Sequence, residues 1–226
     1  MLNLDFSSLT PAAIATLASG MAISLQVAGT ALAVGLVWGT MLAMMRLSHF
    51  RMLSLFATVY INLFRSIPLA MVLLSFYLIV PQMLRSLFDT GTDTRLLSAL
   101  VGFALFESAY YAEIIRAGIK SVPKGQLAAA VALGMKPLQA MRLVVLPQAF
   151  KNMLPLLLTQ LIVLFQDTSL VYVLSIPDFL GAASKVAQRD GRLVEMYLFA
   201  AVVYFAISCL ASFGVRRLQT RIAFVH

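Results

Sequence analysis

Long stretches of the chain carry no charged side chain, and these stretches define its class. Residues 6–45 and residues 196–215 contain no Asp, Glu, Lys or Arg. About 20 apolar residues in a helix cross a bilayer core of roughly 30 Å. Helices are favoured there because every backbone polar group must find its partner within the protein. The pattern therefore predicts an all-α integral membrane protein.

The hydrophobic pattern predicts five transmembrane helices within one transmembrane domain, residues 1–226. As a single helix, residues 6–45 would be about 60 Å long at 1.5 Å per residue, twice what one crossing needs. We therefore expect residues 1–19 to form an interfacial N-terminal segment. The spans are expected at 20–45, 53–80, 96–116, 152–175 and 195–215.

Charge is scarce and unevenly distributed. Only 12% of the residues are charged, against roughly 25% in a soluble domain, and the net charge is +8. Most Lys and Arg fall on the side that carries residues 46–52, the connection 117–150 and the C-terminus. Because basic residues concentrate on the cytoplasmic side, the N-terminus is expected outside and the C-terminus inside. We read this charge as membrane topology and expect no nucleic-acid partner.

The cytoplasmic connection is unusually long and is punctuated by glycine and proline. Residues 128–133 are strong helix formers, and Gly134 can end that helix in the left-handed region. Pro137 suits the first turn of a second helix, which Pro147 is expected to end or kink. The product is helix, bend, helix. It would either lie as a hairpin on the lipid surface or act as a lever seated in a groove of a partner.

This connection resembles the signature of ATP-binding cassette (ABC) importer permeases. That signature reads Glu-Ala-Ala, three residues, Gly, nine residues, Ile, one residue, Leu-Pro. The chain departs from it at Ala128, in place of the acidic residue, and at Val144. The resemblance implies that a coupling loop, residues 117–150, contacts a separate ATPase through Gln126, Ala128, Ala129, Ala130, Gly134, Leu146 and Pro147.

Three further segments are similar to the polar amino-acid uptake branch of that family. They are AYYAEIIRAGIKSVPKGQ at residues 109–126, FRSIPL at 64–69 and LFQDTSLVYVLS at 164–175, the last resembling glutamate/aspartate permeases most closely. The resemblance implies ATP-driven import of a polar, acidic amino acid by alternating access across the inner membrane. Its implied partners are two ATPase copies, a sister permease or second copy of this chain, and an extracytoplasmic binding protein. The chain itself would not be an enzyme and would need no cofactor.

Charged residues inside the spans are candidate functional groups because their insertion into a membrane is costly. Arg65 and Asp167 lie at similar depths, about 21 and 24 Å from the inner edge at 1.5 Å per residue. The Arg65 guanidinium matches a substrate carboxylate, and Asp167 could accept from an α-ammonium. Alternatively, the two could form a structural bridge with each other or with Glu107. Further candidate substrate contacts are Gln166, Thr168 and Ser169.

Two features bear on gating. Pro68 withholds an amide hydrogen and should bend the second span beside Arg65, as in the broken helices of midplane sites. Glu113 and Arg116 lie three residues apart on one helix face. They form either a local interfacial pair or a cytoplasmic gate or support for the loop, and Glu107 is a further candidate gating charge. The lone histidines indicate no metal site.

Three other functions stay open from the residues alone. The importer could carry a different amino acid. The chain could be an ion-coupled secondary transporter, although five spans give no obvious inverted repeat. It could also be a membrane scaffold that transports nothing.

Overall fold

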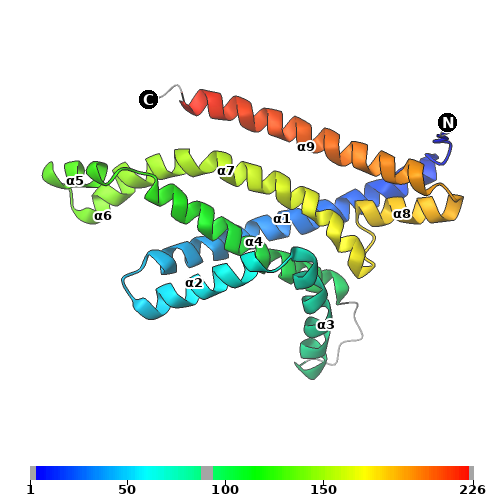
Figure 1. The fold of residues 1–226 in the computed structure, drawn as a ribbon, viewed down its shortest axis with the longest axis horizontal. Coiled ribbons are helices and arrows are strands. Elements are labelled where there is room, and N and C mark those ends of the chain that lie inside the picture. The colour runs from blue at the N-terminus through cyan, green and yellow to red at the C-terminus, as the bar shows by residue number, and fades with distance from the viewer. Residues whose placement is uncertain (1–3, 88–93, 224–226) are drawn as a thin grey trace.

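The computed structural model describes residues 4–87 and 94–223, and over these residues it is helical without a β-strand. This confirms the expected all-α class. Long helices run side by side, and the N- and C-termini lie at opposite ends of the bundle (Figure 1). The elements are α1 Pro11–Leu47, α2 Arg51–Ser66, α3 Leu69–Leu87, α4 Arg95–Lys120, α5 Lys124–Ala132, α6 Pro137–Ala140, the π-turn η1 Met141–Val145, α7 Leu146–Asp167, the 3₁₀ segment η2 Thr168–Leu174, α8 Phe179–Asp190 and α9 Leu193–Ala223.

Four of the five expected spans correspond to continuous helical segments. These are Pro11–Leu47, Arg95–Lys120, Pro137–Leu174 and Leu193–Thr220, each long and apolar enough to cross a membrane. The remaining expected span is the broken pair α2 and α3. The described part of the chain thus has four such segments, or five when the broken pair counts as one.

The expected span 53–80 is not one helix. α2 and α3 meet at an angle of 107°, and α3 projects away from the bundle in Figure 1. Ile67 ends α2 in an extended conformation, with φ −107° and ψ 136°, because a residue before proline is driven out of the helical region. The predicted bend at Pro68 is confirmed, but it is a sharp turn between two helices.

α1 passes through Gly20 without a break. Residues 11–19 therefore continue the first span as one helix rather than forming a separate one, and the interfacial position of residues 1–19 stays a prediction. Glycines let α1 approach its neighbours closely. A Cβ at Gly20 would lie 2.6 Å from the Asp178 carbonyl oxygen, and one at Gly39 would lie 2.7 Å from the Ser108 carbonyl oxygen.

α4 lies at the centre of the bundle and α9 at its edge. In the apolar window of α4, 67% of the residues are buried, against 11% in that of α9. The main core joins α1, α3, α4 and α7 through side chains such as Leu73, Phe103 and Leu164, none of which is exposed.

α8 is an element that the sequence pattern did not predict. Asp178 caps it, because its carboxylate accepts from the Leu180 amide at 3.2 Å and the Gly181 amide at 2.9 Å. The Ser24 hydroxyl of α1 accepts from the Phe179 amide at 3.1 Å. Asp178 lies outside the membrane-spanning segments and is buried, which raises its pKa to about 6.

Pro147 does not end a helix, so the first of its two expected effects, an end or a kink, is wrong. It lies in the first turn of α7, where a missing amide hydrogen costs little. The π-turn Met141–Val145 precedes it, and helical backbone continues from Pro137 to Leu174.

Candidate functional site

A polar cavity of about 470 Å³ lies where α2 breaks into α3. The break leaves Arg65 in the last turn of α2 and brings Pro68 and Leu69 to the cavity wall. Facing helices α4 and α7, with Leu170 of η2, supply the rest of the lining. Its polar side chains are Arg65, Ser66, Tyr110, Gln160 and Asp167.

Helical periodicity explains which residues of α7 reach this cavity. Gln160, Val163 and Asp167 line it, and their spacing of three and four residues places them on one helix face. On α4, Tyr110 meets the Arg65 side chain, whose guanidinium carbon lies 5.5 Å from the centre of the phenol ring. This is a cation–π contact.

Arg65 and Asp167 both face the cavity without an ionic partner. Among the described residues, Arg65 makes no ion pair within 4.0 Å, and the Asp167 carboxylate accepts no hydrogen bond. The alternative of a structural bridge between Arg65 and either Asp167 or Glu107 is therefore not realised in this conformation. A guanidinium and a carboxylate remain open to the same cavity.

Glu107 lies behind the cavity wall. Its side chain is completely buried and accepts two hydrogen bonds from the Gln160 amide nitrogen, at 3.0 and 3.4 Å. Because Gln160 donates towards Glu107, its amide oxygen is left as an acceptor for the cavity. Glu107 thus orients Gln160.

The other expected substrate contacts do not line the cavity. Gln166 is exposed, and Thr168 is buried with its hydroxyl donating to the Phe165 carbonyl at 2.7 Å. Ser169 is half-buried. These three neighbours of Asp167 lie outside its helix face because each step along a helix turns the side chain by about 100°.

Tyr110 and Gln160 are cavity residues that sequence reasoning missed. Gln160 precedes Asp167 by seven residues, or two helical turns, and this spacing is a signal that could have identified it.

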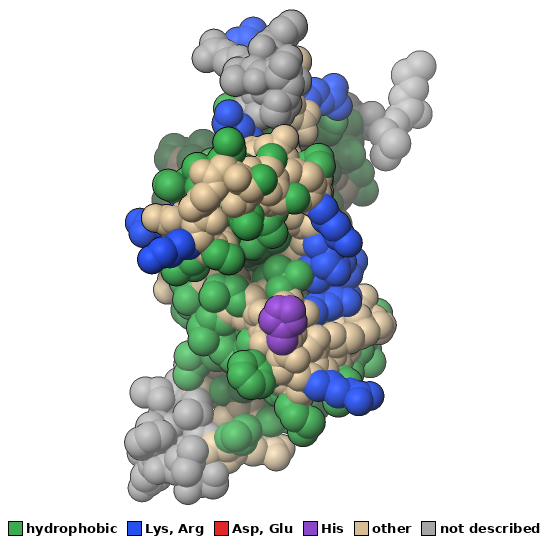
Figure 2. Space-filling model, turned by 90° about the vertical axis from the view of Figure 1, so that its left-hand side faces the viewer, with side chains coloured by type: hydrophobic (Ala, Val, Ile, Leu, Met, Phe, Trp, Pro, Cys, Tyr) green, Lys and Arg blue, Asp and Glu red, His purple; other side chains and the backbone are tan. Residues whose placement is uncertain are grey.

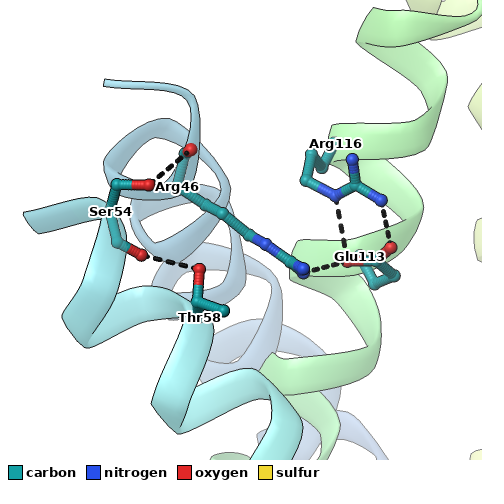
Figure 3. A network of polar contacts seen from close by, with 5 residues as sticks. All are labelled: Arg46, Ser54, Thr58, Glu113 and Arg116. Atoms are coloured by element: carbon teal, nitrogen blue, oxygen red, sulfur yellow. Dashed lines mark hydrogen bonds and ion pairs between the residues drawn. The ribbon is translucent and has the colours of Figure 1, made fainter. Parts of the chain in front are cut away.

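Glu113 is the centre of an ion cluster that includes Arg46 and Arg116 (Figure 3). The Arg116 guanidinium binds both of its carboxylate oxygens, with the Nε–Oε2 distance at 3.0 Å. The two side chains are thus in contact, as their spacing of three residues predicts. Arg46 of α1 also binds Glu113, and the Ser54 hydroxyl of α2 donates to the Arg46 carbonyl at 3.2 Å. The cluster therefore links α1, α2 and α4.

The expected coupling loop is helix, bend, helix, as predicted. Gly134 adopts φ 89°, and the Met135 amide donates to the Ala130 carbonyl at 3.2 Å, which closes the end of α5. Pro137 begins α6. Beneath the loop, Val122, Val145 and Ala149 form a small buried cluster.

The outer surface of this loop combines small and apolar side chains. Ala130 is buried, whereas Gln126, Ala128, Ala129, Gly134 and Pro147 are exposed. Leu133 and Leu138 are 84% and 78% exposed, and Leu146 is 40% exposed. Such an apolar protrusion at a helix bend is typical of a surface that another protein covers.

The end of the bundle that carries this loop is basic. Figure 2 shows Lys and Arg side chains distributed over that face beside hydrophobic ones, with no acidic side chain visible on it. The loop between α1 and α2 and the end of α9 lie at this same end (Figure 1).

Comparisons with known proteins agree with this architecture. Residues 35–224 match the family described as binding-protein-dependent transport system inner membrane component. The chain is 56% identical over 225 residues, 99% of its length and 100% of the relative, to the glutamate/aspartate import permease protein GltK of Escherichia coli O6:H1 (strain CFT073). It is 34% identical, with 94% of each chain covered, to the arginine transport system permease protein ArtQ of Bacillus subtilis (strain 168).

A solved structure has the same fold. It is the crystal structure of an amino acid ABC transporter with histidines, which matches with a TM-score of 0.86 and 32% identity over 97% of this chain and 100% of that one. The chain therefore belongs to the inner-membrane permease components of binding-protein-dependent ABC importers, and it is a transport subunit rather than an enzyme.

Proposed function

We propose that this permease carries glutamate or aspartate, and that the cavity beside Pro68 binds it. One observation carries the proposal: Arg65 and Asp167 face a single cavity of about 470 Å³ and have no ionic partner in residues 4–87 and 94–223. An acidic amino acid brings two carboxylates and one ammonium, so it needs cations and an acceptor together. The relative named a glutamate/aspartate import permease, 56% identical over the full chain, supports this substrate class.

The cavity offers a distinct partner for each group of such a substrate. Arg65 binds one carboxylate through its planar fork. Asp167 and the amide oxygen of Gln160 accept from the ammonium. The second carboxylate lies at the start of α3, where helix amides and the helix dipole favour an anion. Gln166, Thr168 and Ser169 then act indirectly by shaping the end of α7.

The transport cycle depends on partner proteins at both membrane faces. We propose that the basic end in Figure 2 is cytoplasmic, with the N-terminus outside. Two ATPase copies grip the coupling loops of this chain and of a sister permease or second copy, at Leu133, Leu138 and the exposed alanines. An extracytoplasmic binding protein delivers substrate to the other end. ATP and loaded binding protein bias a two-state equilibrium between outward and inward access.

The Glu113 cluster fits a gate at the cytoplasmic end. Its ionic contacts join α1 to α4 and are about four-fifths shielded from solvent, since Arg46 and Glu113 are 21% and 22% exposed, and the Ser54 hydrogen bond adds α2. Movement of the loop helices would break and re-form these contacts. Glu107 supports the binding cavity instead, through Gln160.

The test is uptake by the complete assembly. Proteoliposomes containing this chain, its sister permease and ATPase are supplied with binding protein and ATP, and radiolabelled glutamate, aspartate, glutamine and arginine are compared. We expect ATP-dependent uptake of the two acidic amino acids above the others. Preference for another amino acid would overturn the substrate assignment. Uptake by this chain alone on an ion gradient would indicate a secondary transporter, and no uptake of any amino acid would favour a scaffold.

A further inference from the structure

A second polar pocket, of about 460 Å³, lies between the end of η2 and one face of α8. Its walls are residues 172–173 and 175–177 on one side and Gly181, Ser184, Lys185 and Gln188 on the other. Helix α8 lies at the end of the bundle that carries the N-terminus, opposite the coupling loop (Figure 1). This is the extracytoplasmic end in the proposed topology.

Contacts of the segment between η2 and α8 fix the shape of this pocket. Ser175 ends η2 in the left-handed conformation, with φ 57° and ψ 28°, and its carbonyl accepts from the Arg95 guanidinium at 3.4 Å. Gly181 lets α8 approach the segment closely, because a Cβ there would lie 2.7 Å from the Ile176 carbonyl oxygen. The walls are therefore held together by the protein itself.

The charge of the lining favours an anion. Among the described residues, Lys185 is the only charged side chain that lines the pocket. It makes no ion pair with residues 4–87 or 94–223. The Arg95 guanidinium, bound to the Ser175 carbonyl, brings a second positive charge to the wall.

Ser184 offers a hydrogen-bond donor that the described residues do not use. It is 2% exposed, and its oxygen accepts from the Gln188 amide nitrogen at 3.0 Å and from the Tyr197 hydroxyl at 3.2 Å. Both lone pairs of the oxygen are then occupied, so the hydroxyl hydrogen is left to donate to a ligand. Because Gln188 donates to Ser184, its amide oxygen remains an acceptor. The pocket thus presents a cation, a donor and an acceptor together.

η2 separates this pocket from the cavity beside Pro68. Leu170 lines that cavity, whereas Tyr172 and Val173 line the pocket at α8. At about 2 Å of rise per residue in a 3₁₀ helix, Leu170 and Tyr172 are about 4 Å apart along the axis. A molecule that leaves the outer pocket therefore has one short segment to pass before it reaches Arg65 and Asp167.

We propose that the pocket at α8 is a reception site, which binds the transported acidic amino acid before it enters the cavity beside Pro68. This inference rests on the proposed function. One carboxylate pairs with Lys185 and accepts from Ser184, and the ammonium donates to the Gln188 amide oxygen. A volume of about 460 Å³ falls within the range of small-molecule sites, about 300–1,000 Å³, whereas one acidic side chain of a docked protein would leave most of it unfilled. Selection against cationic amino acids begins here, because Lys185 repels their additional positive charge.

Protection of a cysteine in the pocket tests the proposal. Val173 lines the pocket and is 47% exposed, and Cys209 is the single native cysteine. In a Cys209→Ser background, Val173→Cys is therefore the one thiol of this chain for a water-soluble reagent. The assembled importer, with ATPase and second permease, is labelled in nanodiscs without binding protein, in the presence of glutamate, aspartate or arginine. Mass spectrometry of this chain gives the labelling rate.

We expect glutamate and aspartate to slow the labelling and arginine to leave it unchanged. Lys185→Gln should raise the glutamate concentration for half-protection about 10-fold, as expected for the loss of one charge-assisted hydrogen bond. Arg189→Gln is the matched control, because Arg189 is an exposed cation on α8 outside the lining, and it should not change the protection. Arg65→Gln should not change it either, because Arg65 lies in the other cavity.

Labelling that acidic amino acids do not slow, or protection that Lys185→Gln does not weaken, would overturn the proposal. Protection by the binding protein alone would also overturn it, because an acidic side chain of that protein would then occupy the pocket. Tyr172→Cys, on the same wall, is the second reporter if Val173→Cys does not assemble. Uptake distinguishes this failure from failure of the proposed function: an importer that takes up glutamate without protection lacks the reception site alone, whereas one that prefers another amino acid has a different substrate.

Discussion

Replacement of Arg65 by glutamine is the sharpest test of the polar cavity. Arg65 has no ionic partner among the described residues, so its removal leaves no buried carboxylate without a partner. The protein loses only a cation–π contact with Tyr110, worth about 0.5–1 kcal/mol. A bound substrate loses charge-assisted hydrogen bonds worth about 1.5–3 kcal/mol. We therefore expect an intact assembly whose apparent affinity for glutamate falls by about 10- to 100-fold.

The assay measures ATP-dependent uptake of radiolabelled glutamate as a function of loaded binding protein. Arg65→Lys keeps the charge but not the planar fork and should fall between the wild type and Arg65→Gln. Arg142→Gln is the control for charge, because Arg142 is exposed on the coupling-loop side. Glutamate uptake by Arg65→Gln at wild-type half-saturation would refute the reasoning. Failure of Arg65→Gln to assemble would show that the arginine is structural.

Four other changes test separate parts of the account. Ala129→Glu on the exposed surface of the loop should abolish ATPase association and uptake while membrane insertion is unchanged. A pull-down assay measures the association and a transport assay measures the uptake. Retained association would contradict the role of the loop. Glu113→Gln removes ionic contacts with two arginines and should lower the free energy of unfolding by about 2 kcal/mol, so an unchanged denaturation curve would argue against the cluster. Gly39→Ala should cost about 1–3 kcal/mol by overpacking, since its Cβ would lie 2.7 Å from a carbonyl oxygen, whereas Gly29→Ala meets no atom within 4 Å and should be neutral. Burial raises the pKa of Asp178 from 3.8 to about 6, so the folded state binds a proton more tightly than the unfolded chain. The free energy of unfolding should therefore rise by up to about 3 kcal/mol as the pH falls from above 6 to about 4. Asp178→Asn keeps the helix cap and should remove this pH dependence.

Features that depend on local chemistry could be predicted from the sequence. The long apolar spans, the left-handed Gly134 and the helix start at Pro137 each follow from a few neighbouring residues, and the structure has all of them. The bend at Pro68 was also expected. Its angle of 107° was not, because it depends on how α3 packs against α4.

Features that depend on contacts between distant segments could not be predicted from the sequence. Arg65 and Asp167 were paired by depth alone, and the structure brings them to one cavity. Tyr110 joins them only because α4 happens to present that face to α2. Arg46 reaches Glu113 across 67 positions of the chain. Helix α8 lies between two expected spans, and its cap, Asp178, and its cationic side chains are residue types that are also common in polar loops.

A structure of the assembled importer, determined with aspartate bound in the membrane, tests the central claim most directly. The account predicts ligand density in the cavity beside Pro68, with a carboxylate about 3 Å from the Arg65 guanidinium and the ammonium beside Asp167. Aspartate bound elsewhere along the pathway, with Arg65 joined to a protein carboxylate instead, would contradict it.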